Sequence, residues 1–111
     1  MTFLSSSVVP AATGKVQVKR DKNTNYVINV SVQNLAPADR LKPPQRAYIS
    51  WMESAGNSVK KLGLLEPSSK NLDASLTATA VASPDRVFIT AENSPETQYP
   101  GGTEVLTTEG K

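Results

Sequence analysis

Apolar and polar side chains alternate along several short runs of this chain, and this alternation limits the possible folds more than any other feature. In YVINVSVQ (26–33) apolar residues occupy every second position from Tyr26 to Val32, and LDASLTATA (72–80) repeats the pattern with leucine and alanine. Successive side chains of a strand point to opposite sides of its sheet, whereas a helix would scatter these positions around its circumference. Both runs therefore predict half-buried β-strands.

Further runs show the same strand character, so we expect strands at residues 15–19, 26–33, 47–53, 59–65, 72–80, 86–92 and 104–108. Clusters of Gly, Pro, Asn, Asp and Ser separate these runs and favour turns. Within the run 59–65 we expect Leu62 and Leu64 on one face, and within 86–92 we expect an inward face formed by Val87, Ile89 and Ala91. The spacing predicts an all-β fold, an antiparallel β-sandwich of about seven strands that is immunoglobulin-like.

The chain has 111 residues, of which 38% are hydrophobic and 20% are charged. This length suits one domain, and the composition is that of a folded chain rather than a disordered one. We expect a flexible N-terminal segment at residues 1–12, the β-sandwich domain at 13–108 and a C-terminal tail at 109–111. The opening residues have neither a basic start nor a long apolar run, so they do not predict a secretory signal.

The absence of histidine and cysteine excludes several kinds of chemistry. Serine–histidine triads, thiol catalysis, zinc–thiolate sites and blue-copper sites all need one of these residues. The net charge is only +2, and the basic residues are spread along the chain, so no concentrated surface for nucleic acid is predicted. We therefore expect a non-enzyme with no cofactor, no metal site and no nucleic-acid partner.

Two short motifs resemble parts of known sites but are better explained by structure. Asp21, Asn23 and Asn25 match the opening of a calcium loop, yet the glycine and the bidentate glutamate of that loop are missing, which favours a polar turn. Ser58 and Lys61 match a serine acylase spacing that works on a helix, where side chains three residues apart meet. On a strand they face opposite sides.

The carboxylates of Glu92 and Glu96 lie on either side of an Asn-Ser-Pro turn and are close enough in sequence to share acid–base work or a cation. No feature of the sequence supplies a pocket around them. We therefore expect both to be solvated charges of the turn.

Three aromatic residues are candidates for binding a partner: Tyr48, Trp51 and Tyr99. A tryptophan on a central strand usually fills a sandwich core, and the alternative is an exposed aromatic platform. Since Tyr48 and Trp51 are three residues apart, a regular strand would point them to opposite faces.

A series of short blocks resembles, in order and spacing, the C-terminal domain of anti-sigma-K factors. The blocks are GKV (14–16), VQNLAP (32–37), YISW (48–51), LGLL (62–65), VFITAE (87–92), SP (94–95), PGG (100–102) and VL (105–106). The resemblance covers roughly residues 13 to 108. In that family the domain is the extracytoplasmic part of membrane-anchored bacterial regulators of sigma factors.

The resemblance implies a non-catalytic extracytoplasmic domain, periplasmic or at the cell surface, that senses a signal or protects a regulator against regulated proteolysis. Its partner would be an unknown protein or ligand on that side, and contact with a membrane would come only through a segment not present in this chain. The alternative is a free-standing secreted or periplasmic adhesion or carbohydrate-binding module that uses Tyr48, Trp51 or Tyr99 for stacking.

Overall fold

The computed structural model describes residues 2–4, 6, 8–41, 44–54, 58–68 and 72–108. Its strands are β1 (Thr13–Arg20), β2 (Tyr26–Gln33), β3 (Ala47–Ser54), β4 (Ser58–Leu65), β5 (Ala74–Ala80), β6 (Arg86–Glu92) and β7 (Thr103–Thr107). A short 3₁₀ helix, Ala38–Arg40, lies between β2 and β3. The predicted all-β fold is confirmed, and the expected tail at 109–111 lies outside the described residues. The described part contains no helix whose length and hydropathy would let it cross a membrane.

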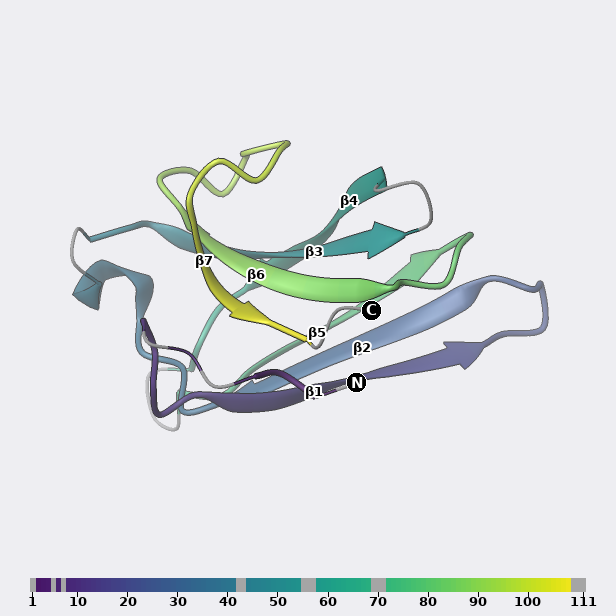
Figure 1. Cartoon of the computed structure of the whole chain (residues 1–111), viewed down its shortest axis with the longest axis horizontal. Helices are drawn as coiled ribbons and strands as arrows, with labels where there is room; N and C mark the ends of the chain where they lie inside the picture. Colours follow the sequence, from purple (N-terminus) through teal and green to yellow (C-terminus); the bar gives the residue numbers. More distant parts are fainter. Residues whose placement is uncertain are drawn as a thin grey trace.

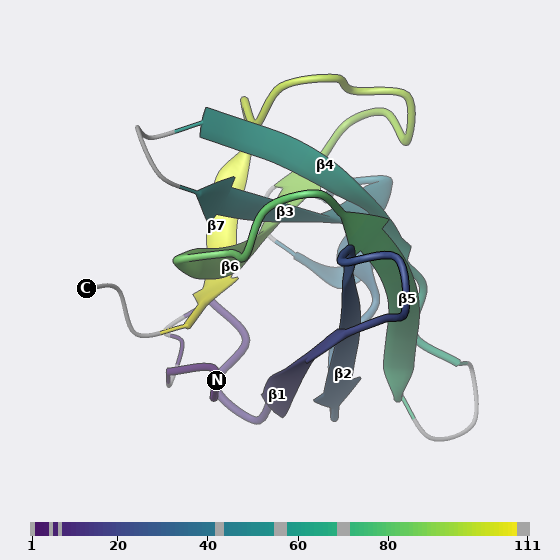
Figure 2. The same ribbon diagram turned by 90° about the vertical axis from the view of Figure 1, so that its right-hand side faces the viewer.

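The strands form two antiparallel sheets with the orders β1-β2-β5 and β4-β3-β6-β7 (Figures 1 and 2). Neighbours in sequence pair as β1–β2, β3–β4 and β6–β7, whereas β5 returns to β2 and β6 returns to β3. An immunoglobulin constant domain groups its first, second, fifth and fourth strands against its third, sixth and seventh. This chain keeps that grouping but moves the fourth strand beside the third, so the sandwich is immunoglobulin-like.

The main core lies between the two sheets and is filled by alternate side chains of facing strands. Six inward residues of the central strands β2 and β6 are at most 1% exposed: Ile28, Val30, Val32, Val87, Ile89 and Ala91. Fully burying an aliphatic side chain of this size contributes about 1.5–3 kcal/mol. The period-two pattern of β2 is therefore confirmed, and the expected inward face of β6 lies in the same core.

Strand β5 begins at Ala74, two residues later than the expected start at Leu72. Leu72 has a φ of 57°, in the left-handed region that interrupts a strand. Its amide donates to the carbonyl of Ser68, and its own carbonyl accepts from the amide of Leu35. Leu72 therefore closes a turn instead of joining the ladder.

Strand β4 contains a β-bulge that reverses its inward and outward positions. Its pairing with β3 shifts by one residue between Ser50 and Trp51, which leaves Leu62 as the extra residue. The expectation that Leu62 and Leu64 share a face is therefore wrong. Leu62 packs against the core, whereas Leu64 is 38% exposed and Leu65 is 1% exposed.

The N-terminal segment that precedes β1 contacts one strand of each sheet. The amide of Phe3 donates to Gly14 of β1 over 3.0 Å, and the amide of Leu4 donates to Thr107 of β7 over 2.8 Å. We call these two contacts the N-terminal clasp. The mobility expected for residues 1–12 stays a prediction, but this segment contributes buried side chains to the core, namely Phe3, Val9 and Ala12.

The bulge predicts opposite outcomes for two neighbouring leucines. Leu65→Ala should lower the free energy of unfolding by about 2–5 kcal/mol, because it empties a buried site. Leu64→Ala, the matched control, should lower it by less than about 1 kcal/mol, because its side chain is partly solvated. Urea unfolding of both variants measures the difference, and a larger loss for Leu64→Ala would contradict the bulge.

Candidate binding groove

The face of the four-stranded sheet that points away from the other sheet, here called the outer face, is also buried. Trp51 lies on it with Ile49 and Phe88, and these side chains form a hydrophobic cluster separate from the main core. The β6–β7 connection, residues 93–102, runs over this face and is called the outer-face loop (Figure 1). Strand β6 is therefore buried on both sides, as a strand covered by two layers must be.

The carboxylate of Glu92 holds the outer-face loop down. Its Oε2 atom accepts hydrogen bonds from the backbone amides of Gly101 over 3.2 Å and Gly102 over 3.1 Å. It also accepts one from the hydroxyl of Thr90 over 2.5 Å, and that hydroxyl accepts a hydrogen bond from the Trp51 indole nitrogen over 2.8 Å. One carboxylate therefore joins the loop to the buried tryptophan.

The expectation for the two carboxylates is wrong for Glu92. Glu92 is only 4% exposed, whereas Glu96 is exposed. The loop folds back over Glu92 and supplies backbone donors in place of water, which satisfies the buried carboxylate. The outer-face loop gains a second tie where the Lys61 ammonium donates to the carbonyl of Pro95 over 2.9 Å.

Arg86 closes one end of the covered face. Its guanidinium carbon lies 4.1 Å from the centre of the Phe88 ring, and its nitrogens pair with Glu53 at 3.1 Å and Glu104 at 2.9 Å. Burial opposes the charged form, but the hydrogen bonds to Glu104 and Glu53 outweigh it and raise the pKa of Arg86. These contacts keep Arg86 over the aromatic cluster.

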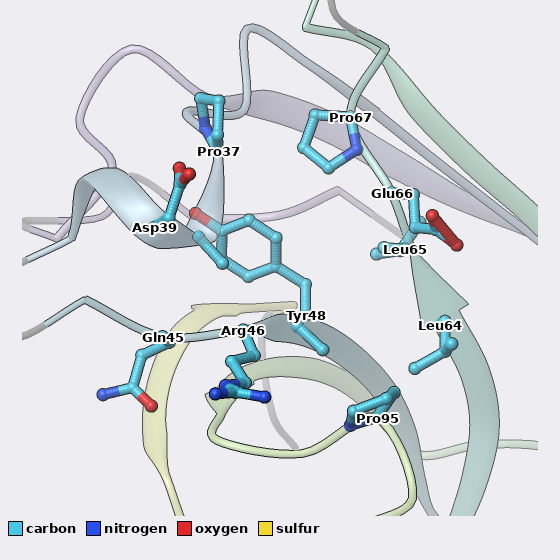
Figure 3. A pocket seen from close by; sticks show the side chains of 12 residues that line it. Pro37, Asp39, Gln45, Arg46, Tyr48, Leu64, Leu65, Glu66, Pro67 and Pro95 are labelled. Atoms are coloured by element: carbon cyan, nitrogen blue, oxygen red, sulfur yellow. The ribbon is translucent and has the colours of Figure 1, made fainter.

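An open groove of about 500 Å³ lies at one end of the sandwich (Figure 3). The Tyr48 ring lies at the centre of the lining residues, with Pro37 and Pro67 on one side and Pro95 on the other. Leu64 adds exposed apolar surface, because the bulge turns it outward. Proline fixes its own φ, so these walls lose little freedom when a ligand binds.

Charged side chains of both signs surround this apolar floor. Asp39, Arg46 and Glu66 line the groove and are exposed. The ion pairs among the described residues are those of Arg86, so these three side chains have no partner of opposite charge within that part of the chain. The groove therefore suits a ligand that carries both apolar and charged groups.

Tyr48 links the groove to the core. It is 1% exposed, and its hydroxyl donates to the carbonyl of Ala36, which ties β3 to the β2–β3 connection. Burial raises the pKa of Tyr48 to about 12, and the nearby charge of Asp39 adds to the rise. The hydroxyl therefore keeps its proton near neutrality and remains a hydrogen-bond donor to Ala36.

The structure separates the three predicted partner-binding aromatics. Tyr48 and Trp51 point to opposite faces of β3, as their spacing predicts, but each is only 1% exposed, so neither ring is available as a stacking platform. Tyr99, in the outer-face loop, is 79% exposed, and its role in binding stays a prediction. The meeting of Pro37, Pro67 and Pro95 in the groove was not predicted, because in the sequence each of them only marks a separate turn.

The other candidate motifs take the structural roles expected for them. The Asp21 carboxylate accepts hydrogen bonds from the amides of Asn23 over 2.8 Å and Asn25 over 3.0 Å, so it closes a turn. Ser58 and Lys61 lie on strand β4. Among the described residues no cluster of three or more acidic, histidine or cysteine side chains has the arrangement of a metal site.

Two adjacent glycines test the attachment of the outer-face loop. A Cβ atom at Gly102 would lie 1.9 Å from the Ala91 carbonyl oxygen, whereas one at Gly101 would meet no atom closer than 4.0 Å. Gly102→Ala should therefore lower the free energy of unfolding by about 2 kcal/mol or more, and Gly101→Ala by less than about 0.5.

Trp51 is the single tryptophan of the chain, so its fluorescence reports on this loop directly. Gly102→Ala should shift the emission of the folded protein to longer wavelength, because the loop lifts and water reaches the indole. Gly101→Ala should leave the spectrum unchanged. Equal effects of the two substitutions would show that the loop is not held in this way.

The raised pKa of Tyr48, about 12 against an ordinary value of 10.0, predicts a loss of stability in base. The folded state holds this proton more tightly, so its contribution is complete below pH 10 and is lost as pH rises towards 12. Between those values the unfolding free energy should fall by up to about 2 kcal/mol more in the natural chain than in Tyr48→Phe. Tyr99→Phe, at an exposed site, should keep the full fall in denaturant titrations across this range.

Comparison of the chain with models of protein families, with curated proteins and with solved structures finds no match.

Proposed function

We propose that this chain is a non-catalytic extracytoplasmic domain of a membrane-anchored regulator of the anti-sigma type, and that it senses a ligand or protects the regulator against proteolysis. The observation that carries the proposal is the groove, because it brings together residues of the β2–β3 connection, the start of β3, the end of β4 and the outer-face loop. The order of the resembling blocks supports it further, since those blocks fall on or beside β1, β2, β3, β4, β6 and β7.

Binding in the groove would stabilise the whole sandwich. A ligand in contact with Arg46, Pro67 and Pro95 would hold the entry to β3, the end of β4 and the outer-face loop together. Any ligand that binds the folded state alone raises the free energy of unfolding. The groove thus converts the presence of a ligand into resistance of the domain to opening.

The N-terminal clasp carries this resistance to the chain that enters the domain. Phe3 and Leu4 donate to β1 and β7, one strand from each sheet, so the clasp persists only while both sheets are in place. Proteases cut segments that open, and a clasped segment opens with the domain. A regulator cut close to this point would therefore be protected while the sandwich is folded.

The alternative function is a secreted or periplasmic adhesion or carbohydrate-binding module. Of the three aromatics proposed for stacking, only Tyr99 has an exposed ring. The coding sequence upstream of Met1 distinguishes the two proposals: a membrane helix preceded by a cytoplasmic helical region supports the regulator, and a signal peptide alone supports the module.

Regulator processing in the native cell tests the proposal. Deleting residues 13–108 from the full-length gene, or introducing Phe3→Ala, should increase cleavage of the regulator and transcription by its sigma factor. Phe3 is 7% exposed, so truncating its side chain should lower the free energy of unfolding by about 3 kcal/mol. Leu4→Ala, at a residue 49% exposed, is the matched control and should leave processing unchanged. If processing is the same after the deletion, the proposed role is wrong.

A further inference from the structure

Each β-sandwich has edge strands, whose outer backbone groups can pair with another chain unless something protects them. Here the edges are β1, β5, β4 and β7. Natural proteins protect edges with charges, bulges, short strands or covering segments. The four edges differ in this protection.

Three edges are protected. Strand β1 carries Lys15 and Lys19 and pairs at one point with the N-terminal segment. Strand β4 has the bulge at Leu62 and the charge of Lys60. Strand β7 has five residues, an irregular register, the charge of Glu104 and the contact with Leu4 of the clasp.

Among the described strands, β5 lacks the charges, bulges and backbone contacts that protect the other edges, although its Leu76 side chain lies against Gly63 of β4 in the other sheet. It reads ASLTATA, without a charge, a proline or a glycine, and it pairs with β2 in an unbroken register at all seven positions. It lies at the rim of its sheet in Figure 2. Among the described residues, no backbone group of β5 forms a hydrogen bond outside the strand ladders.

We propose that the outer edge of β5 pairs antiparallel with β5 of a second copy, so that the two three-stranded sheets become one continuous sheet in a dimer. Thr77 is the middle residue of Ala74–Ala80. A two-fold axis at that position brings Thr77 opposite the partner's Thr77 and Ser75 opposite the partner's Thr79. On the inward face it brings Leu76 opposite the partner's Ala78.

The composition of β5 fits a second copy better than an unrelated peptide. Ser75, Thr77 and Thr79 are exposed on one face, so self-pairing places hydroxyl residues opposite hydroxyl residues, a favourable cross-strand combination. No charge opposes itself across the axis, and no charge is offered to attract a charged peptide. Because the described strands leave one such edge in each molecule, the pairing closes as a dimer and does not extend into a fibre.

Sedimentation of the full chain over a concentration series tests the proposal. The natural chain should form a dimer, and Thr77→Lys should raise the dissociation constant by at least about tenfold, because two like charges face each other at the axis. Gln17→Lys is the matched control. Gln17 is exposed and lies in the same row of the sheet as Thr77, because both pair with Asn29. It belongs to β1, the opposite edge of the sheet, so this substitution should leave the dimer intact.

A charge-swap mixture separates lost pairing from lost folding. Thr77→Lys and Thr77→Asp should each be monomeric alone, and an equimolar mixture should form a heterodimer because opposite charges then meet at the axis. The proposal is overturned if the natural chain stays monomeric up to about 1 mM, if Thr77→Lys leaves the dimer unchanged, or if the mixture remains monomeric. Binding of an unrelated extended peptide at β5 without self-association would overturn it too.

Discussion

The structure depends on covering the four-stranded sheet on both faces with a chain of only 111 residues. The three-stranded sheet covers the inner face, and the outer-face loop, residues 93–102, covers the other (Figure 1). The hydrogen bonds of the Glu92 carboxylate to the loop make that second layer possible. The same loop supplies Pro95 to the groove, so the candidate site exists only while the loop is held in place.

The burial of the Glu92 carboxylate must be offset by hydrogen bonds. Removing a charged group from water is unfavourable by several kcal/mol unless its oxygens find donors. Glu92 finds the hydroxyl of Thr90 and the amides of Gly101 and Gly102, and hydrogen bonds to a charged group contribute about 1.5–3 kcal/mol each. The close approach of Gly102 to Ala91 permits no side chain there, so glycine is a condition of this arrangement.

Local alternation predicted the strands well, because it reports which side of a strand faces the core. The bounds of β2 and β6 agree with the pattern to the residue, and β5 differs only where Leu72 takes a left-handed φ. The phase of β4 was not predictable, since a bulge depends on its pairing with β3. Contacts between distant segments decide the burial of Glu92 and Trp51 and the assembly of the groove prolines, and no local pattern records them.

Tyr48 belongs to the core and lies beneath the groove, so the groove keeps its form only while the core is packed. A ligand at a hundred times its dissociation constant adds about 2.7 kcal/mol to the stability of the state that binds it. Domains of this kind are stable by about 5–15 kcal/mol in total. Such a ligand would therefore reduce the opened population about a hundredfold without any change of shape, and the N-terminal clasp would remain closed in the same proportion. Under the proposed sensing role, the equilibrium between the folded and the opened domain would carry the signal, and the folded state would need only one conformation.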